Sequence, residues 1–230
     1  MSADVEIPVL FEDDALLVID KPAGVLSLPD GYDKSLPHLA TLLAARHGRL
    51  WLVHRLDRDT SGVLVLARSA EAHHHLNDQF RERRVEKVYR ALIAPIPAWE
   101  KISAGFPLRK DGDRQHRTVV DSQRGKPART DFEVLERFPQ AALVAARPHT
   151  GYTHQIRAHL RALGCPILAD DLYRLPGSPT FAPTPIDRMA LHAYSISFTH
   201  PLSAELLVIS TPAPADFMSA IAKLRNESAA

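Results

Sequence analysis

The sequence predicts a single α+β domain, in which a mixed, largely antiparallel sheet is flanked by helices. Short apolar segments with strand character outnumber the segments with helical periodicity. Several of these strand segments are joined by short polar turns, as in hairpins. No internal repeat or clear linker interrupts the 230 residues, a length that suits one large domain or two small ones. We therefore expect one domain over 1–230, with frayed ends at 1–6 and 225–230.

The expected strands are apolar runs bounded by polar turns or proline. The first two form a hairpin that turns at Glu12-Asp13-Asp14, and Pro22 ends its second strand because proline cannot donate to a ladder. The run at 63–67 is aliphatic throughout, which is typical of a strand buried on both faces. Strands are expected within 7–20 and at 63–67, 85–93, 130–135, 141–146, 195–199 and 206–210.

The expected helices carry apolar residues at helical spacing and recognisable end signals. Ser69 and Thr153 suit N-caps, whereas Gly48 and Gly164 suit the positions that follow a helix. Helices are expected at 36–47, 69–84, 153–164 and 215–224. Residues 99–130 are polar and broken by glycine and proline, and no separate strand or helix is assigned to them.

Composition excludes several classes of protein. The net charge is only +1, from 28 basic and 27 acidic residues, so any nucleic-acid surface must be local. One cysteine, Cys165, excludes an internal disulfide and any multi-cysteine metal site. No run approaches the roughly 20 apolar residues that span a bilayer, and the N-terminus lacks a signal-peptide pattern. We expect a cytoplasmic protein without a membrane partner, a metal or a cofactor.

The sequence His54-Arg55-Leu56-Asp57-Arg58-Asp59-Thr60-Ser61-Gly62 lies between two apolar runs. A polar loop held by buried elements at both ends can position a reactive side chain, and Asp57 is the candidate. The alternative is a simple turn, in which Asp57 and Asp59 make Asx turns and Thr60 and Ser61 close the turn. Arg55, beside His54, makes the loop richer in charge than a turn requires.

A second informative segment, residues 149–164, contains an amphipathic helix that places Arg157 near its N-terminus. The helix macrodipole disfavours a cation there by about 0.3–1 kcal/mol, so an anion nearby would explain it. That anion is either a carboxylate such as Asp57 or a phosphate of a ligand; the alternative is an arginine that faces solvent. By the same reasoning His154 and Arg161, on the same face, are cations in need of an anion.

Two basic segments are candidates for contact with RNA. Tyr89 lies among arginines and lysines of the strand at 85–93, as either a solvated edge or a stacking ring beside a phosphate track. The loop-rich segment 99–130, which contains Arg109 and Arg117, is locally positive. It is either an exposed hairpin or an RNA-contacting surface.

These motifs together resemble the RluA-type RNA pseudouridine synthases. HRLDRDTSG at 54–62 is similar to their catalytic signature, and nine matching residues are a specific signal. KPAG at 21–24, KVYRA at 87–91, THQIRAHL at 153–160, GCPILADDLY at 164–173 and LHA at 191–193 resemble their other motifs, in matching order. The resemblance covers nearly the whole chain.

The resemblance implies isomerisation of uridine in structured RNA, ribosomal or transfer RNA or both, by a monomer without cofactor. It implies that Asp57 is the nucleophile at C1′ or the base at C2′, that Arg157 pairs with it, and that Tyr89 stacks on the base. Leu191 is expected to pack against the base, and Arg55 to enter the space that the flipped uridine vacates. The remaining residues expected to bind substrate are His54, Lys21, Thr60, Arg109 and Arg117.

The chain departs from the family at two positions, Tyr152 in place of a basic residue and Ala169 in place of glycine. It also shows no N-terminal S4 RNA-binding module, so we expect the catalytic domain to choose the substrate. Two other functions are compatible with parts of the sequence. A non-catalytic RNA-binding protein would need the basic segment but not Asp57, and a hydrolase with an aspartate nucleophile would need further carboxylates for magnesium.

Overall fold

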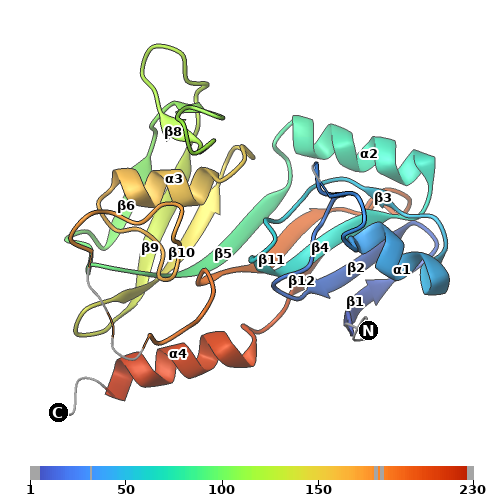
Figure 1. Ribbon diagram of the computed structural model, residues 1–230. Helices are drawn as coiled ribbons and strands as arrows, with labels where there is room; N and C mark the ends of the chain where they lie inside the picture. The colour runs from blue at the N-terminus through green and yellow to red at the C-terminus, as the bar shows by residue number, and fades with distance from the viewer. Residues whose placement is uncertain (1–5, 32, 179–180, 182–183, 227–230) are drawn as a thin grey trace. The chain divides into compact units, whose positions relative to one another are not determined.

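The computed structural model describes residues 6–31, 33–178, 181 and 184–226 (Figure 1). The chain forms two compact units, each made from two segments. Unit 1 consists of residues 1–87 and 193–212, and unit 2 consists of residues 88–192 and 213–230. Of the ends expected to fray, 1–5 and 227–230 lie outside the described residues, whereas 225–226 are the last residues of a helix.

The strands of unit 1 are antiparallel wherever their register is defined. The expected hairpin is confirmed: Asp13 closes its turn, since its Oδ1 accepts from the amides of Ala15 at 2.8 Å and Leu16 at 2.7 Å. All seven residues of β4 are buried, as expected for a strand covered on both faces. The strands are β1 (Val9–Glu12), β2 (Leu16–Lys21), β3 (Trp51–Leu52), β4 (Ser61–Ala67), β11 (Leu191–Thr199, from residue 193 in this unit) and β12 (Leu206–Ser210).

Two helices belong to unit 1. Helix α1 (Leu39–His47) begins three residues later than expected, because Pro37 biases the residue before it away from helical geometry and His38 is extended. It ends before Gly48, whose φ is +69°. Helix α2 (Ala70–Arg81) begins as expected, with Ser69 Oγ accepting from the amide of Ala72 at 3.1 Å. It ends three residues early, and Arg83 already has a left-handed φ of +59°.

The core of unit 1 packs α2 against the strands. Gln79 on α2 makes two hydrogen bonds to β11, from Nε2 to the carbonyl of Thr199 at 2.7 Å and from the amide of Thr199 to Oε1 at 2.8 Å. These bonds fix the helix along the strand. The apolar residues of the core are Ala15, Leu16, Val18, Val63, Val65, Ala67, Ala72, Leu76, Val85, Ile196 and Phe198.

Unit 2 contains an antiparallel sheet in the order β5-β10-β9-β6. Strands β5, β9 and β10 confirm the expectation, whereas β6 lies inside the polar segment 99–130, to which the sequence assigns no strand. Four residues are too short to show a strand pattern, and β6 is specified by its pairing with β9. The strands are β5 (Glu86–Ile93, from residue 88 in this unit), β6 (Lys101–Ala104), β9 (Thr130–Arg137) and β10 (Ala142–Pro148).

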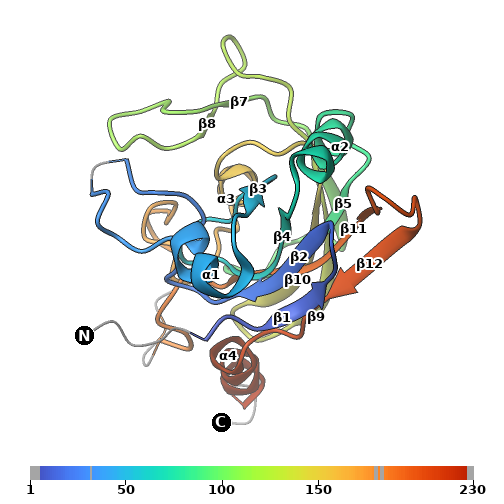
Figure 2. The ribbon, with the colours of Figure 1, turned by 90° about the vertical axis from the view of Figure 1, so that its right-hand side faces the viewer.

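Helix α3 (Gln155–Ala162) lies between β9 and β10 on one side and a small hairpin on the other (Figures 1 and 2). The hairpin consists of β7 (Leu108–Arg109) and β8 (Val119–Val120). The expected N-cap, Thr153, is wrong: His154 holds that position in a left-handed conformation, with φ of +54°. The expected end is confirmed, since Gly164 follows the helix with φ of +79°.

The C-terminal helix α4 (Ala215–Asn226) also packs on the core of unit 2. Phe217 and Leu224 of this helix are fully buried, in the same cluster as Leu160 of α3 and Val144 of β10. The α+β class with a largely antiparallel sheet and flanking helices is therefore confirmed. The single domain over 1–230 stays a prediction. Among the described residues, no helix combines the length and apolar character needed to cross a bilayer.

Candidate active site

Asp57 lies in the loop of residues 53–60 that joins β3 to β4 in unit 1. Its side chain is half-buried, and its carbonyl accepts from the amide of Thr60 at 3.1 Å. Leu56 and Thr60, on either side, are 4% and 2% exposed, so both ends of this turn are pinned to the core. A backbone turn is present and holds Asp57 in place, but the side-chain hydrogen bond that a simple turn would take from Thr60 is not found, since Thr60 Oγ1 has no partner among the described residues. Arg55 is exposed on the same loop.

Lys21 connects this loop to the end of β2. It is fully buried, and its Nζ donates to the carbonyls of Pro22 at 2.9 Å, Val25 at 2.8 Å and Arg58 at 3.0 Å. The expected contact between Lys21 and substrate is therefore not supported, because a buried ammonium with three carbonyl acceptors has its donors engaged. Its observed role is to tie the end of β2 to the residue after Asp57.

Ser27 makes a second connection that sequence reasoning missed. Its Oγ donates to the carbonyl of Leu56 at 2.8 Å and accepts from the amide of Leu56 at 3.2 Å. Both backbone groups of the residue before Asp57 are thus satisfied by one side chain. The contact spans 29 positions, so no local sequence pattern marks it. Thr60 is also turned inward, and its burial argues against the direct substrate contact expected of it.

His54 is a structural residue of the loop rather than an evident substrate ligand. Its Nε2 accepts from the amide of Val65 on β4 at 3.0 Å, and its ring stacks on Phe80 of α2 with 5.0 Å between centroids. Burial, and to a lesser degree the ammonium of Lys87, lowers the pKa of His54 to about 3. The ring is therefore neutral at physiological pH, as an acceptor at Nε2 requires.

Replacement of His54 by phenylalanine is expected to lower the free energy of unfolding by about 1–3 kcal/mol at pH 7.5, because the Val65 amide loses its acceptor. The loss should shrink toward acid pH. The unfolded histidine takes up a proton below about pH 6.5 and the folded one only near pH 3, so the wild type loses up to about 1.4 kcal/mol per pH unit between them.

Urea denaturation at several pH values between 4 and 7.5 measures this difference. The control is His75→Gln on the exposed side of α2, which should shift stability by less than about 0.5 kcal/mol. A His54→Phe deficit that stays constant over this range would contradict the assignment.

Tyr89 and Leu191 belong to unit 2. Tyr89 on β5 pairs with Ala146 on β10, and its half-buried ring packs at the edge of the core. Leu191, the first residue of β11, is 4% exposed and part of the same core. A half-buried aromatic ring retains an accessible part for stacking, whereas the contact expected of Leu191 must come through its few exposed atoms.

Arg157 sits in the first turn of α3 and has the carboxylate partner that the macrodipole argument requires. Its Nε and Nη2 donate to the two oxygens of Asp170 at 2.7 and 2.8 Å, a bidentate pair with side chains 10% and 1% exposed. The solvent-facing alternative is therefore wrong. Arg161 lies in the last turn, where the macrodipole favours a cation, so the argument made for it does not hold.

Tyr173 completes the surroundings of Arg157. The guanidinium carbon lies 4.7 Å from the centre of the tyrosine ring, a cation–π contact. The phenol oxygen accepts from the amide of Thr118 at 2.9 Å and lies 3.1 Å from Nδ1 of His154. Burial raises the pKa of Tyr173 to about 12, so it remains a neutral phenol. Asp170 and Tyr173 were not assigned site roles from the sequence, although both lie in the family-like segment GCPILADDLY.

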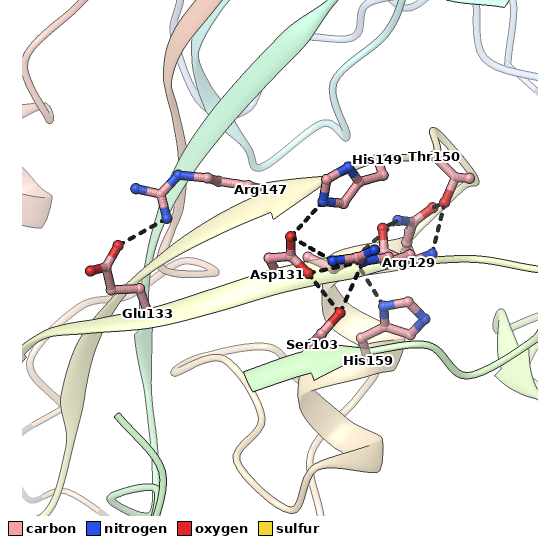
Figure 3. A network of polar contacts seen from close by, with 10 residues as sticks. Ser103, Arg129, Asp131, Glu133, Arg147, His149, Thr150 and His159 are labelled. Carbon is pink, nitrogen blue, oxygen red and sulfur yellow. Dashed lines mark hydrogen bonds and ion pairs between the residues drawn. The ribbon is translucent and has the colours of Figure 1, made fainter. Parts of the chain in front are cut away.

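A polar network fixes the chain around the start of α3. Figure 3 shows Ser103, Arg129 and His149 directed at the carboxylate of Asp131, with contacts of 2.6, 3.1 and 2.6 Å. Burial opposes ionisation of this carboxyl, but these hydrogen bonds outweigh burial and lower the pKa of Asp131 to about 2. An ionised Asp131 thus holds three donors from three different segments.

Gln155 connects this network to α3. Its Nε2 donates to the carbonyl of Arg129 and to Oγ1 of Thr130, both at 3.0 Å, and its Oε1 accepts from Thr150 Oγ1 at 2.7 Å. Gln155 is 4% exposed, so this end of the helix is anchored by a buried side chain in place of a conventional N-cap. The anchoring sets the direction in which Arg157, two residues later, projects.

Arg109 and Arg117 stabilise the small hairpin. Nε of Arg109 donates to Asp121 at 2.6 Å, and Nε of Arg117 donates to Asp113 at 2.7 Å. Arg117 also donates from Nη1 to the carbonyl of Leu172 at 3.1 Å, which ties the hairpin to the segment after Asp170. The acidic partners reduce the local positive charge, so the RNA contact expected of the two arginines stays a prediction.

Ala169, the departure next to Asp170, has a left-handed φ of +56°, where glycine is favoured. Ala169→Gly is expected to raise the free energy of unfolding by up to about 1 kcal/mol. The relief of about 1–2 kcal/mol of backbone strain exceeds the roughly 0.5–1 kcal/mol entropic cost of glycine. Urea denaturation tests this against Ala45→Gly in the exposed face of α1, which should destabilise. Equal destabilisation by both variants would contradict the prediction.

The structure thus gathers the expected residues in two groups. Lys21, His54, Arg55, Asp57 and Thr60 share unit 1. Tyr89, Arg109, Arg117, Arg157 and Leu191 share unit 2. A pairing of Asp57 with Arg157 joins residues of the two units and stays a prediction.

The sequence of this chain is similar to those of known proteins. A family model described as RNA pseudouridylate synthase matches residues 15–162. Ribosomal large subunit pseudouridine synthase C of Haemophilus ducreyi is 39% identical over 98% of this chain and 71% of the relative. Its counterpart in Escherichia coli (strain K12) is 40% identical over 95% of this chain and 70% of the relative.

Two solved structures are also similar. Human RNA Pseudouridylate Synthase Domain Containing 4 aligns with a TM-score of 0.78 at 28% identity, covering 95% of this chain and 93% of that one. Human RNA Pseudouridylate Synthase Domain Containing 1 aligns with a TM-score of 0.75 at 27% identity, covering 93% and 86%. The similarity therefore extends from the sequence motifs to the arrangement of the chain.

Proposed function

The chain belongs to the RNA pseudouridylate synthase family, and we propose that it converts uridines of ribosomal RNA to pseudouridine with Asp57 as the catalytic carboxylate. Membership makes it an isomerase that acts on RNA, which decides against the non-catalytic RNA-binding protein and the hydrolase. The observation that carries the choice of Asp57 is its position on a turn fixed by Lys21, Ser27 and Thr60.

The reaction breaks the N1–C1′ bond of uridine and joins C1′ to C5, with the C5 proton lost and a proton gained at N1. No water is consumed, so the product is an isomer of the substrate. Asp57 acts at the sugar, by attack at C1′ or by proton abstraction at C2′. Either role requires an ionised carboxylate held at a fixed position. The pinned turn supplies the fixed position for the half-buried carboxylate of Asp57.

Arg157 and Tyr89 are proposed to act with Asp57. Arg157 keeps a permanent positive charge in a buried position, which is the property required of a group that stabilises a carboxylate such as that of Asp57. Its bidentate pair with Asp170 fixes the guanidinium plane. Tyr89 stacks on the uracil and assists removal of the C5 proton, with Leu191 packing against the base.

The uridine must leave its stack to reach a carboxylate held on the protein, which costs a few kcal/mol. We assign Arg55 the space that the base vacates, since its side chain is exposed two residues from Asp57. His54 and Lys21 support the same loop from inside. Arg109 and Arg117 shape the hairpin that flanks α3, where further contacts with RNA are expected.

Ribosomal RNA is the proposed substrate because relatives that are 39–40% identical to this chain are named as ribosomal large subunit enzymes. Transfer RNA is the competing substrate. A protein acting on ribosomal RNA is expected in the cytoplasm, and we expect it to act as a monomer.

Carbodiimide-based mapping of pseudouridine in total RNA tests this function. Cells without the protein should lose one or more pseudouridines of the large-subunit RNA. The wild-type gene should restore them and the Asp57→Asn gene should not. Loss confined to transfer RNA would overturn the choice of substrate, and restoration by Asp57→Asn would overturn the choice of catalyst.

A further inference from the structure

A cavity of about 280 Å³ lies in unit 2 between the β7–β8 hairpin and α3. Its lining includes Arg117 and Thr118 from the hairpin, Ala158 and Arg161 from α3, and Tyr173 from the segment that follows. None of the residues assigned to catalysis lines it. The remaining lining residues, Val119, Val120 and Ala162, are apolar.

The charged residues that line the cavity are both arginines. Its lining contains no carboxylate. Arg117 is held by Asp113, which is not part of the lining, and by the carbonyl of Leu172. Arg161 Nε is buried and has no hydrogen-bond partner among the described residues. A guanidinium has donors only, so a ligand for Arg161 must be an acceptor.

Thr118 supplies a second polar atom without a partner. The residue is 2% exposed, and its Oγ1 has no hydrogen-bond partner among the described residues. Its backbone is fixed, because the phenol oxygen of Tyr173 accepts from its amide at 2.9 Å and donates to its carbonyl at 3.1 Å. A buried polar atom left unpaired is costly, so two of them on residues that line one cavity point to a ligand.

We propose that this cavity binds a phosphate group, and that the group is a backbone phosphate of the RNA substrate. A phosphate oxygen can accept from Arg161 Nε and from Thr118 Oγ1, whereas the charge of Arg117 is already balanced by Asp113. The cavity is slightly smaller than the roughly 300 Å³ at which ligand pockets usually begin. It therefore suits one phosphodiester and part of its sugar, with the apolar lining against the sugar.

This proposal rests on the proposed RNA substrate, and free phosphate is the other source of the same chemistry. The first experiment uses inorganic phosphate alone. The NMR signal of the Arg161 Nε–H group is followed during titration with potassium phosphate, against potassium chloride of equal ionic strength. A saturable shift with phosphate only is expected, and Thr118→Val should weaken it.

Thr118→Val also separates a binding role from a purely structural one. Removal of an unpaired buried hydroxyl should raise the melting temperature of the free protein by about 2–4 °C. A variant that is more stable and binds phosphate less well supports a ligand site. Unchanged phosphate binding in this variant would remove Thr118 from the site.

The second experiment uses RNA, in an Asp57→Asn background that prevents turnover. Arg161→Gln is expected to weaken RNA binding about fivefold at 0.15 M salt and to lower the slope of log K against log salt by about 0.9, the contribution of one phosphate contact. The control is Arg225→Gln on α4, which removes an equal charge far along the chain and should leave the slope unchanged.

The outcomes distinguish this proposal from the function on which it rests. Absence of any protein-dependent pseudouridine refutes the proposed function, whatever phosphate does. If pseudouridines depend on the protein and Arg161→Gln binds RNA like Arg225→Gln, the phosphate site fails alone. A phosphate-dependent NMR shift without a change in salt slope would overturn RNA as the occupant. If Arg161→Gln does not fold, phosphate binding by folded Thr118→Val still tests the proposal.

Discussion

Replacement of Asp57 by asparagine is expected to abolish pseudouridine formation, by at least about 10⁴-fold, in a protein that still folds and binds RNA. Asparagine has nearly the same shape but cannot act as a nucleophile or base at the sugar. The hydrogen bonds that hold the loop involve the backbone of Leu56, Asp57 and Arg58, so they do not depend on the carboxylate. Single-turnover assays on ribosomal RNA, with RNA binding measured in parallel, test both expectations.

The matched control is Asp59→Asn, two residues away and exposed on the same loop. It removes the same charge, and turnover should remain within about twofold of wild type. Retained turnover in Asp57→Asn would show that Asp57 is not the catalyst. Equal losses in both variants would show that loop charge rather than a specific carboxylate is required.

Replacement of Asp170 by asparagine is expected to lower the free energy of unfolding by about 3–5 kcal/mol. The change leaves the buried guanidinium of Arg157 without its bidentate carboxylate, and breaking a buried ion pair from one side is costly for that reason. Turnover should also fall, by about 10²-fold, because Arg157 loses the partner that fixes its position. Urea denaturation and single-turnover assays measure the two effects.

Asp171→Asn is the control for this prediction, because Asp171 is adjacent but exposed. Its effect on stability should stay within about 0.5 kcal/mol. Similar stabilities for the two variants would mean that the Arg157–Asp170 pair is not a major contact of the folded protein.

The parts of the fold predicted from the sequence are those specified by local patterns. The hairpin around Asp13, the fully buried β4 and the Ser69 N-cap each depend on residues close together in the chain. The start of α3 was predicted wrongly because its buried anchor, Gln155, bonds to residues about 25 positions earlier. Strand β6 was missed because only its pairing with β9 defines it.

The candidate site likewise contains features that the sequence predicts and contacts that depend on the tertiary fold. Asp57 stands out because a charged loop between apolar runs is visible in the sequence. The need of Arg157 for an anion was also inferred correctly, but the partner within unit 2 is Asp170, which contacts it through the tertiary fold. Lys21 was expected to contact substrate. The sequence shows only a lysine at a strand end and gives no sign that three carbonyls surround its ammonium group.

The interleaving of the two units governs the order in which the protein can fold during synthesis. Unit 1 lacks β12 and most of β11 until about residue 212 has left the ribosome, and unit 2 lacks α4 until about residue 226 has done so. Gln79 must wait for Thr199, 120 positions later, before its two hydrogen bonds can form. Domains generally fold as they emerge from the ribosome. In this chain the last elements of both units emerge close together, so the two units can be completed only at nearly the same time. A chain truncated after His192 would leave both units incomplete.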